Sequence, residues 1–321
     1  MKAAKKLVVS GATGFVGSAL ISRIVREPHL GEALALVRSR SDTLPASIEQ
    51  ICLGSTGDFS RPLPLAEVDT VIHAAARVHV MNDSSDDPLT EFRRVNVEGT
   101  LALARQAAEA GVRRFVFLSS IKVNGESTEP GRAFTANDSP SPQDPYGISK
   151  MEAERALHEL AAETGLEMVI IRPPLVYGPG VKGNFATMVA LVRKGVPLPF
   201  GAIHNKRSLI ALDNLVDLII TCIDHPAAAN QTFLAGDGKD LSTAELLRRV
   251  GEAMGKPARL IPVPAGMLMF GASLLGKKAV AQRLLGSLQV DISKARNVLG
   301  WEPILSVGEG LRRCFVPGNR L

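Results

Sequence analysis

The sequence predicts an α/β protein with a doubly wound parallel sheet and a smaller C-terminal α/β domain. Two observations predict this fold. Short apolar runs alternate with amphipathic segments of helix length, and a glycine-rich loop follows the first apolar run directly. Apolar runs that are separated by helices are typical of βαβ units, in which the strands lie parallel and are buried on both faces.

The expected elements can be placed in chain order. Strands are expected at residues 7–9, 33–37, 70–73, 115–118 and 168–171, and helices at residues 16–26, 90–110 and 148–164. The third helix has clear end signals, because Asp144 can cap it, Pro145 suits its first turn and Gly165 follows its end.

The second half of the chain follows a different pattern. After Pro173 the alternation gives way to Gly/Pro-rich stretches, and later helical patterns occupy residues 243–254 and 292–299. Residues 213–236 hold a helical pattern followed by a strand-like segment, so we expect them to rejoin the sheet. The predicted division is therefore 1–175 plus 213–236 for the sheet domain, and 176–212 plus 237–321 for a substrate domain.

Composition excludes several classes of protein. The chain has 321 residues, and 37 Lys+Arg against 32 Asp+Glu give a net charge of +5. This excess suits an anionic ligand, but the basic residues are scattered and aromatic residues are few, so no nucleic acid partner is expected. Cys52, Cys222 and Cys314 are widely spaced and the histidines form no ligand pattern, so we expect neither a disulfide nor a bound metal.

The apolar stretches of the chain predict neither a membrane span nor an export signal. The first apolar run is too short for a signal peptide. The longest uncharged apolar stretch, residues 260–276, contains Pro262 and Pro264 and falls short of the ~20 residues that span a bilayer. We expect a buried or surface-facing helix near residues 267–275 and a cytoplasmic location, and we do not expect membrane contact.

The glycine-rich loop indicates the ligand of the sheet domain. Gly11, Gly14 and Gly17 lie between the first strand and the first helix. Glycines there allow a tight turn and let the backbone approach a pyrophosphate, which then lies on the positive end of the helix. The alternative is a glycine turn that serves packing only. The predicted dinucleotide contacts in this loop are Gly11, Thr13, Gly14, Phe15, Val16 and Gly17.

The end of the second strand bears on which dinucleotide binds. An NAD site usually carries a carboxylate about 20 residues past the glycines, but residues 33–41 contain none. Arg38, Ser39 and Arg40 stand there instead, and two guanidiniums with a hydroxyl suit a 2′-phosphate. The alternative is an exposed basic loop. We expect NADP(H) to be preferred, with NAD(H) still open.

A catalytic constellation is indicated by Ser120, Tyr146 and Lys150. Positions i and i+4 share a helix face, so the Lys150 ammonium is expected near the Tyr146 phenol. A cation there favours the phenolate and brings the tyrosine pKa toward neutral pH. Ser120 follows a predicted strand at the sheet edge where ligands bind, so its hydroxyl could hold a substrate oxygen beside the tyrosine.

These motifs form an ordered set that resembles the extended short-chain dehydrogenase/reductase family over essentially the whole chain. The set comprises GATGFVG, HAAAR, Asn96 in VNVEGT, SSIKVNG, YGISK, RPPLVYGPG and DISKARNVLGW. The resemblance implies a Rossmann sheet, with Tyr146 as the acid/base, Lys150 on the nicotinamide ribose and Ser120 on the reacting oxygen. It also implies a homodimer formed through the helices at 90–110 and 148–164.

Further cofactor contacts are implied by the same resemblance. Asp58 would face the adenine, Asn96 would support the site from a neighbouring helix, and the backbone at Pro173 and Val176 would face the nicotinamide. The cofactor path between them would be lined by Ala74, Ala75 and Ala76.

The substrate tract resembles the nucleotide-sugar branch of the family. That resemblance implies that Asn184, Pro199 and Phe200 cradle a uridine diphosphate and that Arg207 pairs with its pyrophosphate. Arg283 is the nearest candidate for a second phosphate-binding arginine. A bidentate guanidinium is well matched to a diphosphate, so the expected partner is a UDP-sugar.

Departures from the family patterns narrow the reaction. Dehydratases carry an acidic pair after the catalytic hydroxyl residue, where this chain has Ile121 and Lys122. Epimerases commonly show Tyr-Gly where this chain has Asn124-Gly125, and they keep NAD tightly bound. A steroid-type or flavonoid-type dehydrogenase is disfavoured by Arg207, and a dinucleotide-sensing non-enzyme by the complete catalytic set.

Two functions are therefore left, in a stated order. The arginines after the second strand favour NADPH, and the tracts NFATMVALVRKGVPLPFG, RSLIALDNLVD and RLLGSLQVD resemble bacterial UDP-4-keto-sugar 4-reductases that make UDP-N-acetylquinovosamine. That resemblance implies an NADPH-dependent reductase of the 4-keto group of a UDP-linked, N-acetylated 6-deoxy hexose, which would serve surface polysaccharide (O-antigen, lipopolysaccharide) precursor synthesis. The alternative is a UDP-hexose 4-epimerase, acting on glucose or N-acetylglucosamine, with tightly bound NAD.

Overall fold

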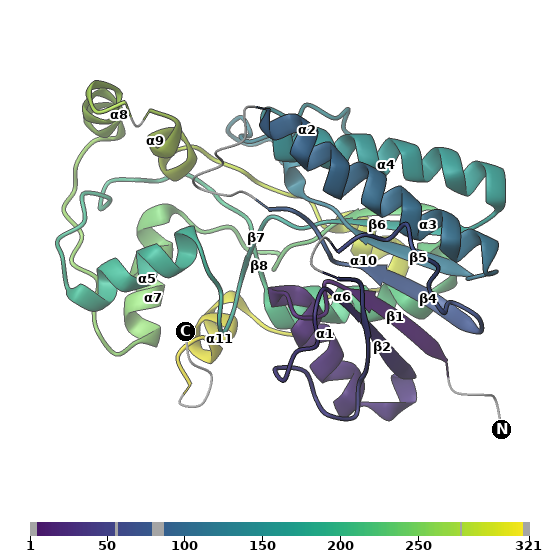
Figure 1. Cartoon of the computed structure of the whole chain (residues 1–321). Helices are drawn as coiled ribbons and strands as arrows, with labels where there is room; N and C mark the ends of the chain where they lie inside the picture. Colours follow the sequence, from purple (N-terminus) through teal and green to yellow (C-terminus); the bar gives the residue numbers. More distant parts are fainter. Residues whose placement is uncertain (1–4, 55–56, 79–86, 277, 317–321) are drawn as a thin grey trace.

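A parallel sheet forms the centre of the molecule in the computed structural model, which describes residues 5–54, 57–78, 87–276 and 278–316. Its strand order is β3-β2-β1-β4-β5-β6-β9 (Figure 1). The strands are β1 (Lys6–Ser10), β2 (Glu32–Val37), β3 (Glu49–Cys52), β4 (Val68–His73), β5 (Arg114–Leu118), β6 (Glu167–Arg172) and β9 (Gln231–Leu234). The doubly wound α/β fold predicted from the sequence is confirmed.

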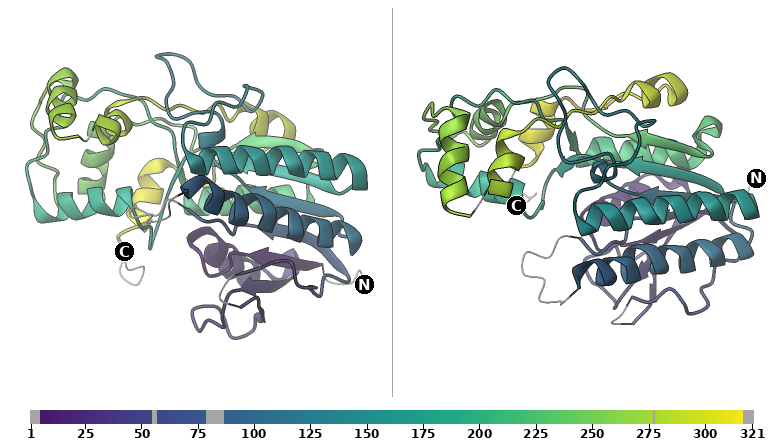
Figure 2. Two further views of the ribbon diagram at one scale, coloured as in Figure 1. Left: turned by 45° about the horizontal axis from the view of Figure 1, so that its top comes forward. Right: turned by 90° about the horizontal axis from the view of Figure 1, so that it is seen from above.

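Two layers of helices cover the sheet. One face carries α1 (Phe15–Arg26), α6 (Leu212–Asp224) and α10 (Ser293–Leu299), and the other carries α2 (Pro88–Arg93), η2 (Arg94–Glu98), α3 (Gly99–Glu109) and α4 (Pro145–Thr164). Successive residues of one strand face opposite layers: Phe115 and Phe117 of β5 pack toward α3 and α4, whereas Val116 packs toward α6. Both layers are visible in Figures 1 and 2.

The structure differs from the sequence-based expectations at two places in the sheet and its helices. The strand β3 was not expected, because its sequence EQIC is short and only partly buried at the sheet edge. The single helix expected at residues 90–110 is instead divided into α2, the π-helical turn η2 and α3. A π-turn inserts an extra residue into the helical repeat, and such turns are frequent at functional sites.

A smaller unit beside the sheet holds its own apolar core. It is built from the parallel pair β7 (Leu175–Tyr177) and β8 (Leu209–Ala211) with α5 (Asn184–Lys194), α7 (Thr243–Ala253) and α11 (Val307–Arg313). The two-domain division remains a prediction. Within it, α10 was expected in the substrate domain, but its Ala295 and Leu299 pack in the core on the α1 and α6 face of the sheet.

The helix expected near residues 267–275 is present as α8 (Ala265–Leu274), and it lies on the surface. The next helix, α9 (Lys278–Leu285), packs beside it. Short 3-10 turns complete the structure: η1 (Pro28–Leu30), η3 (Ile121–Val123) and η4 (Pro226–Ala228). Over the residues that the structure describes, no helix has the length and apolarity needed to cross a membrane.

Candidate active site

The glycine loop between β1 and α1 is built for close backbone packing. Gly11 has a φ of +69°, and the Gly14 N–H donates to its carbonyl oxygen at 2.8 Å. A Cβ on Gly11 would lie 2.6 Å from the Ala75 nitrogen, and one on Gly17 would collide with the Gly11 carbonyl oxygen. Gly14 caps α1 without a side-chain hydrogen bond, and no acidic residue occupies the first helical turn. The first N–H groups of α1 can therefore bind a phosphate, so these residues fit a dinucleotide.

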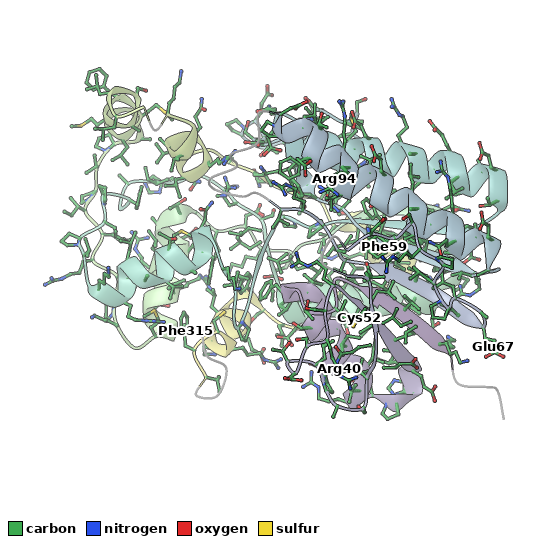
Figure 3. The ribbon with its side chains drawn as sticks, in the orientation of Figure 1. Arg40, Cys52, Phe59, Glu67, Arg94 and Phe315 are labelled. Atoms are coloured by element: carbon green, nitrogen blue, oxygen red, sulfur yellow. The ribbon has the colours of Figure 1, made fainter. Side chains whose placement is uncertain are left out.

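The loop after β2 lies at the same edge of the sheet, next to the loop after β3. Arg38, Ser39 and Arg40 are exposed there, and Arg40 is labelled in Figure 3. A Cβ on Gly57 would lie 3.2 Å from the Arg38 Cγ, so the Arg38 side chain runs past the Gly57–Asp58 turn. The Asp58 carboxylate accepts hydrogen bonds from the Ser60 backbone and hydroxyl, which lower its pKa. The structure thus brings Arg38 and the Asp58 turn together.

Of the three alanines after β4, Ala74 and Ala75 line the loop of β1. The Ala74 N–H donates to the Ser10 carbonyl oxygen at 3.2 Å, and the Ala75 N–H donates to the Ser10 hydroxyl at 3.4 Å. The Ser10 hydroxyl is also linked to His73 Nδ1 at 2.6 Å. These bonds fix the two loops against each other at the point where the strand order reverses, which is where ligands bind in doubly wound sheets.

Asn96 lies in the π-turn η2 and is buried. Its side-chain oxygen accepts from the Arg77 N–H at 2.8 Å, and its amide donates to the Arg77 carbonyl oxygen and the Ser149 hydroxyl. Ser149 lies between Tyr146 and Lys150 on α4. Asn96 therefore ties the loop after β4 to the helix that carries the catalytic candidates.

Tyr146, Ser120 and Lys150 come together at the carboxyl end of β5. Asp144 caps α4 by accepting from the Gly147 N–H at 2.7 Å, so Tyr146 stands in the first turn of that helix. The Ser120 hydroxyl lies close enough to the Tyr146 phenol to lower its pKa. The Lys150 ammonium donates to the Leu118 carbonyl oxygen at 2.9 Å, one turn along the same face of α4.

The electrostatics of this trio are dominated by burial. Burial, together with the Asp144 carboxylate, raises the pKa of Tyr146 to about 12, although the neighbouring Ser120 hydroxyl acts in the opposite direction. Burial lowers the pKa of Lys150 to about 7. Its ammonium also lies 4.3 Å from the centre of the Phe117 ring. Tyr146 is therefore protonated at neutral pH in this structure and can donate a proton.

A cluster of charges beside Tyr146 was not foreseen from the sequence. Lys122 forms ion pairs with Asp144 and with Glu126, the latter at 3.2 Å, and Arg283 of α9 reaches Glu126 at 3.3 Å. From the sequence Asp144 is recognised only as a helix cap. Lys122 and Glu126 are only four residues apart, but the pairs of Lys122 with Asp144 and of Arg283 with Glu126 join distant parts of the chain and leave no local signal.

A second buried network holds the strand ends that carry the site. Arg172, the last residue of β6, binds the Glu154 carboxylate of α4 and the Asn124 side-chain oxygen, the latter at 2.9 Å. Ser119 donates to the same carboxylate. The backbone beyond β6 is fixed as well, because Ile121 N–H donates to the Pro173 carbonyl oxygen at 3.0 Å. Val176 lies nearby in β7 and is partly buried.

The expected substrate residues are only partly brought together. Arg207 donates to the carbonyl oxygens of Arg283 and Gly286 at 2.8 and 3.1 Å, and burial lowers its pKa. Arg207 and α9 are thus adjacent, while the Arg283 side chain turns to Glu126. Asn184 is exposed at the start of α5, and among the described contacts none joins it to Arg207. Pro199 and Phe200 are partly buried, and Phe200 packs on the core of the smaller unit.

Comparison with known proteins establishes the family. Residues 7–236 match the NAD dependent epimerase/dehydratase family. The chain is 47% identical over 324 residues to a UDP-glucose 4-epimerase of Vibrio cholerae, with 99% of this chain and 98% of that protein covered. A UDP-glucose 4-epimerase of Mycolicibacterium smegmatis is 30% identical, with 96% of each chain covered. The chain belongs to the NAD dependent epimerase/dehydratase family, the extended short-chain dehydrogenase/reductase group that its motifs resemble.

Solved structures agree on the fold. The crystal structure of UDP-glucose 4-epimerase from Thermotoga maritima with UDP-glucose superimposes with a TM-score of 0.77 at 22% identity, covering 97% of each chain. The family match and the 47% identical relative make the protein an enzyme of a nucleotide-sugar-modifying family. The family match supports the predicted dinucleotide cofactor at the level of NAD(P).

Proposed function

We propose that the protein is a UDP-hexose 4-epimerase that acts on UDP-glucose or UDP-N-acetylglucosamine and keeps NAD bound through turnover. The observation that carries the proposal is the full-length similarity, 47% identical, to the Vibrio cholerae UDP-glucose 4-epimerase. The geometry of Ser120, Tyr146 and Lys150 is compatible with it. This order reverses the one drawn from the sequence, in which the ketoreductase came first.

Different residues would bind the cofactor and transfer the proton. The glycine loop and the start of α1 would hold the cofactor pyrophosphate, Lys150 would bind the nicotinamide ribose, and Asn96 would support the site. NAD, when bound, would supply a reversible hydride acceptor for C4 of the sugar. Tyr146 takes the proton of the C4 hydroxyl and later returns it, while Ser120 donates a hydrogen bond to that oxygen.

Charge in the occupied site favours this proton transfer. With its pKa raised to about 12, Tyr146 needs a nearby cation before it can act as a base at neutral pH. The Lys150 ammonium, whose pKa is about 7, supplies part of that charge, and an oxidised nicotinamide supplies the rest. The phenolate is therefore favoured when oxidised cofactor is bound and disfavoured when it is absent.

Lys122 argues against dehydration. A dehydratase needs a carboxylic acid next to the catalytic hydroxyl residue to expel the C6 hydroxyl. Here Lys122 occupies such a place and is held by Asp144 and Glu126. An ammonium engaged with two carboxylates is poorly suited to act as that acid, so the sugar keeps its C6 oxygen in the proposed reaction.

One observation favours the second candidate, the NADPH-dependent 4-ketoreductase of a UDP-linked 6-deoxy sugar. Arg38, Ser39 and Arg40 are exposed after β2, with no carboxylate between residues 33 and 41. That surface suits a 2′-phosphate.

We also propose that the protein forms a homodimer through α3 and α4, as the family resemblance implies. Sedimentation velocity tests this part of the proposal.

The test is incubation of the purified protein with UDP-glucose or UDP-N-acetylglucosamine, with no dinucleotide added, followed by NMR of the products. The proposal expects interconversion at C4 and NAD released on denaturation. If neither sugar is converted, and a UDP-4-keto-6-deoxy sugar instead consumes one NADPH per product, the ketoreductase is correct and the epimerase proposal fails.

A further inference from the structure

Helix α8 is an apolar surface element that packs on little but α9. No residue of α8 (Ala265–Leu274) is buried, although the structure describes all of them. Met267, Phe270, Leu274 and Leu275 are 66, 68, 73 and 74% exposed. Both views of Figure 2 and Figure 1 place α8 at the outer end of the smaller unit, away from the sheet. Exposed apolar side chains gathered in this way mark a contact surface.

The helix lacks a polar face. Its single polar side chain, Ser273, donates its hydroxyl to the Met269 carbonyl oxygen of the same helix at 2.9 Å. No charged residue occurs from Leu260 to Gly276. A protein–protein interface has a polar rim around its apolar centre. Lipid, by contrast, can contact a helix on all its exposed sides if the polar groups of that helix are satisfied internally. This arrangement favours lipid over a protein partner.

The segment around α8 carries charge of one sign. Residues 253–290 contain Lys256, Arg259, Lys277, Lys278 and Arg283 and no Asp or Glu. Of these, Arg259 and Lys278 are exposed on either side of α8 in the chain. Basic residues that flank an exposed apolar helix are complementary to anionic headgroups, which add to the apolar contribution.

We propose that α8 inserts into the surface of a lipid bilayer that contains anionic phospholipid, with Arg259 and Lys278 at the headgroups. A helix of 10 residues is about 15 Å long, which reaches into one leaflet but not across the bilayer. The exposure of α8 changes the expectation drawn from the sequence, where membrane contact was not expected. The proposal does not rest on the proposed function, since no catalytic candidate lies on α8.

The test is flotation of the full-length protein with vesicles of phosphatidylethanolamine and phosphatidylglycerol, compared with vesicles of phosphatidylcholine alone. Wild type should float with the anionic vesicles, more weakly at high salt. The double variant Phe270→Ser, Leu274→Ser should bind at least about 10-fold more weakly, because two exposed apolar anchors are lost. Lys278→Glu should weaken binding to the anionic vesicles only. Ile304→Ser, at a residue 49% exposed outside this segment, is the matched control and should bind as wild type does.

The variants should keep their melting temperature and their turnover of soluble substrate, because the changed side chains are exposed. Failure of wild type to float with either vesicle overturns the proposal, as does unchanged flotation of the double variant. If sedimentation instead shows that the double variant forms a smaller species than wild type, and neither floats, then a second copy of the chain covers α8 and the lipid assignment is wrong.

Discussion

The Asn96 amide donates a hydrogen bond to the Ser149 hydroxyl at 3.0 Å, and Ser149 donates to the Tyr146 carbonyl oxygen at 2.8 Å. This chain of bonds joins the π-turn η2 to the helical turn that presents Tyr146. Since Asn96 also holds both backbone groups of Arg77, one buried amide positions two loops of the site.

Replacing Asn96 by alanine should therefore affect both stability and turnover. Each buried group left without a partner costs about 1–3 kcal/mol of unfolding free energy. Urea unfolding measures the loss, and Asn137→Ala, at an exposed asparagine, is the control and should stay within about 0.5 kcal/mol of wild type. Wild-type stability of Asn96→Ala would contradict the positioning role.

The two tyrosines of the chain should respond differently to loss of the hydroxyl. Tyr146→Phe should lower the turnover number by about 10²- to 10⁴-fold, because proton transfer to the sugar oxygen is lost, with little change in stability. Tyr177→Phe removes the donor to the buried Asp237 carboxylate at 2.7 Å and should cost about 1–3 kcal/mol of stability while sparing the chemistry. Steady-state rates and thermal melts of both variants separate the two effects.

His73 should make stability depend on pH. Burial, with the Lys150 charge, lowers its pKa to about 3, so it stays neutral in the folded protein down to that pH. The unfolded chain takes up a proton near pH 6.5, so the unfolding free energy falls as pH drops from about 6.5 toward 3. The variant His73→Gln can keep bonds to Ser10 and Thr100 and should show a shallower fall, by up to about 1.4 kcal/mol per pH unit. Parallel curves for the two proteins would contradict this account.

Lys122 should tune the tyrosine through Asp144. Burial alone would raise the Asp144 pKa, but hydrogen bonds from Lys122 and Gly147 outweigh it, so the pKa is lowered and the carboxylate is charged. In Lys122→Met that charge is no longer balanced, and it should raise the Tyr146 pKa further. The acidic limb of the pH–rate profile should then move to higher pH by up to about one unit. Lys194→Met, at an exposed lysine, should leave the profile in place.

Arg38 and Arg40 separate the two candidate functions. An NAD-dependent epimerase has no 2′-phosphate to bind, so Arg38→Ala, Arg40→Ala should retain its cofactor and its turnover. In an NADPH-dependent reductase the same double variant should raise the KM for NADPH by about 10-fold or more. Measurement of the bound cofactor and of the KM values for both dinucleotides distinguishes the two functions.

Elements whose signal is local could be predicted from the sequence. The five strands expected from apolar runs are all present, because a strand buried on both faces must be continuously apolar. The edge strand β3 lacks that signal, since Glu49 and Cys52 are exposed. The π-turn at Asn96 is likewise invisible to helical periodicity, which continues through it from α2 to α3.

Motif spacing predicted that Ser120 follows a strand and that Tyr146 and Lys150 lie on one helix. The ion pairs of Arg172 with Glu154 and of Lys122 with Asp144 depend on the tertiary fold and leave no spacing pattern. The preference for a reductase rested on Arg38 and Arg40 and on the resemblance of the substrate tract to 4-ketoreductases. Two exposed guanidiniums are equally compatible with a solvated loop, which is why full-length similarity outweighs them.

The central claim is tested most directly with UDP-glucose deuterated at C4 and no added cofactor. If the protein is a 4-epimerase with resident NAD, the label leaves C4 and returns to the same carbon, so UDP-galactose forms with deuterium retained at C4. Absence of UDP-galactose, together with stoichiometric NADPH consumption on a UDP-4-keto sugar, would contradict the account.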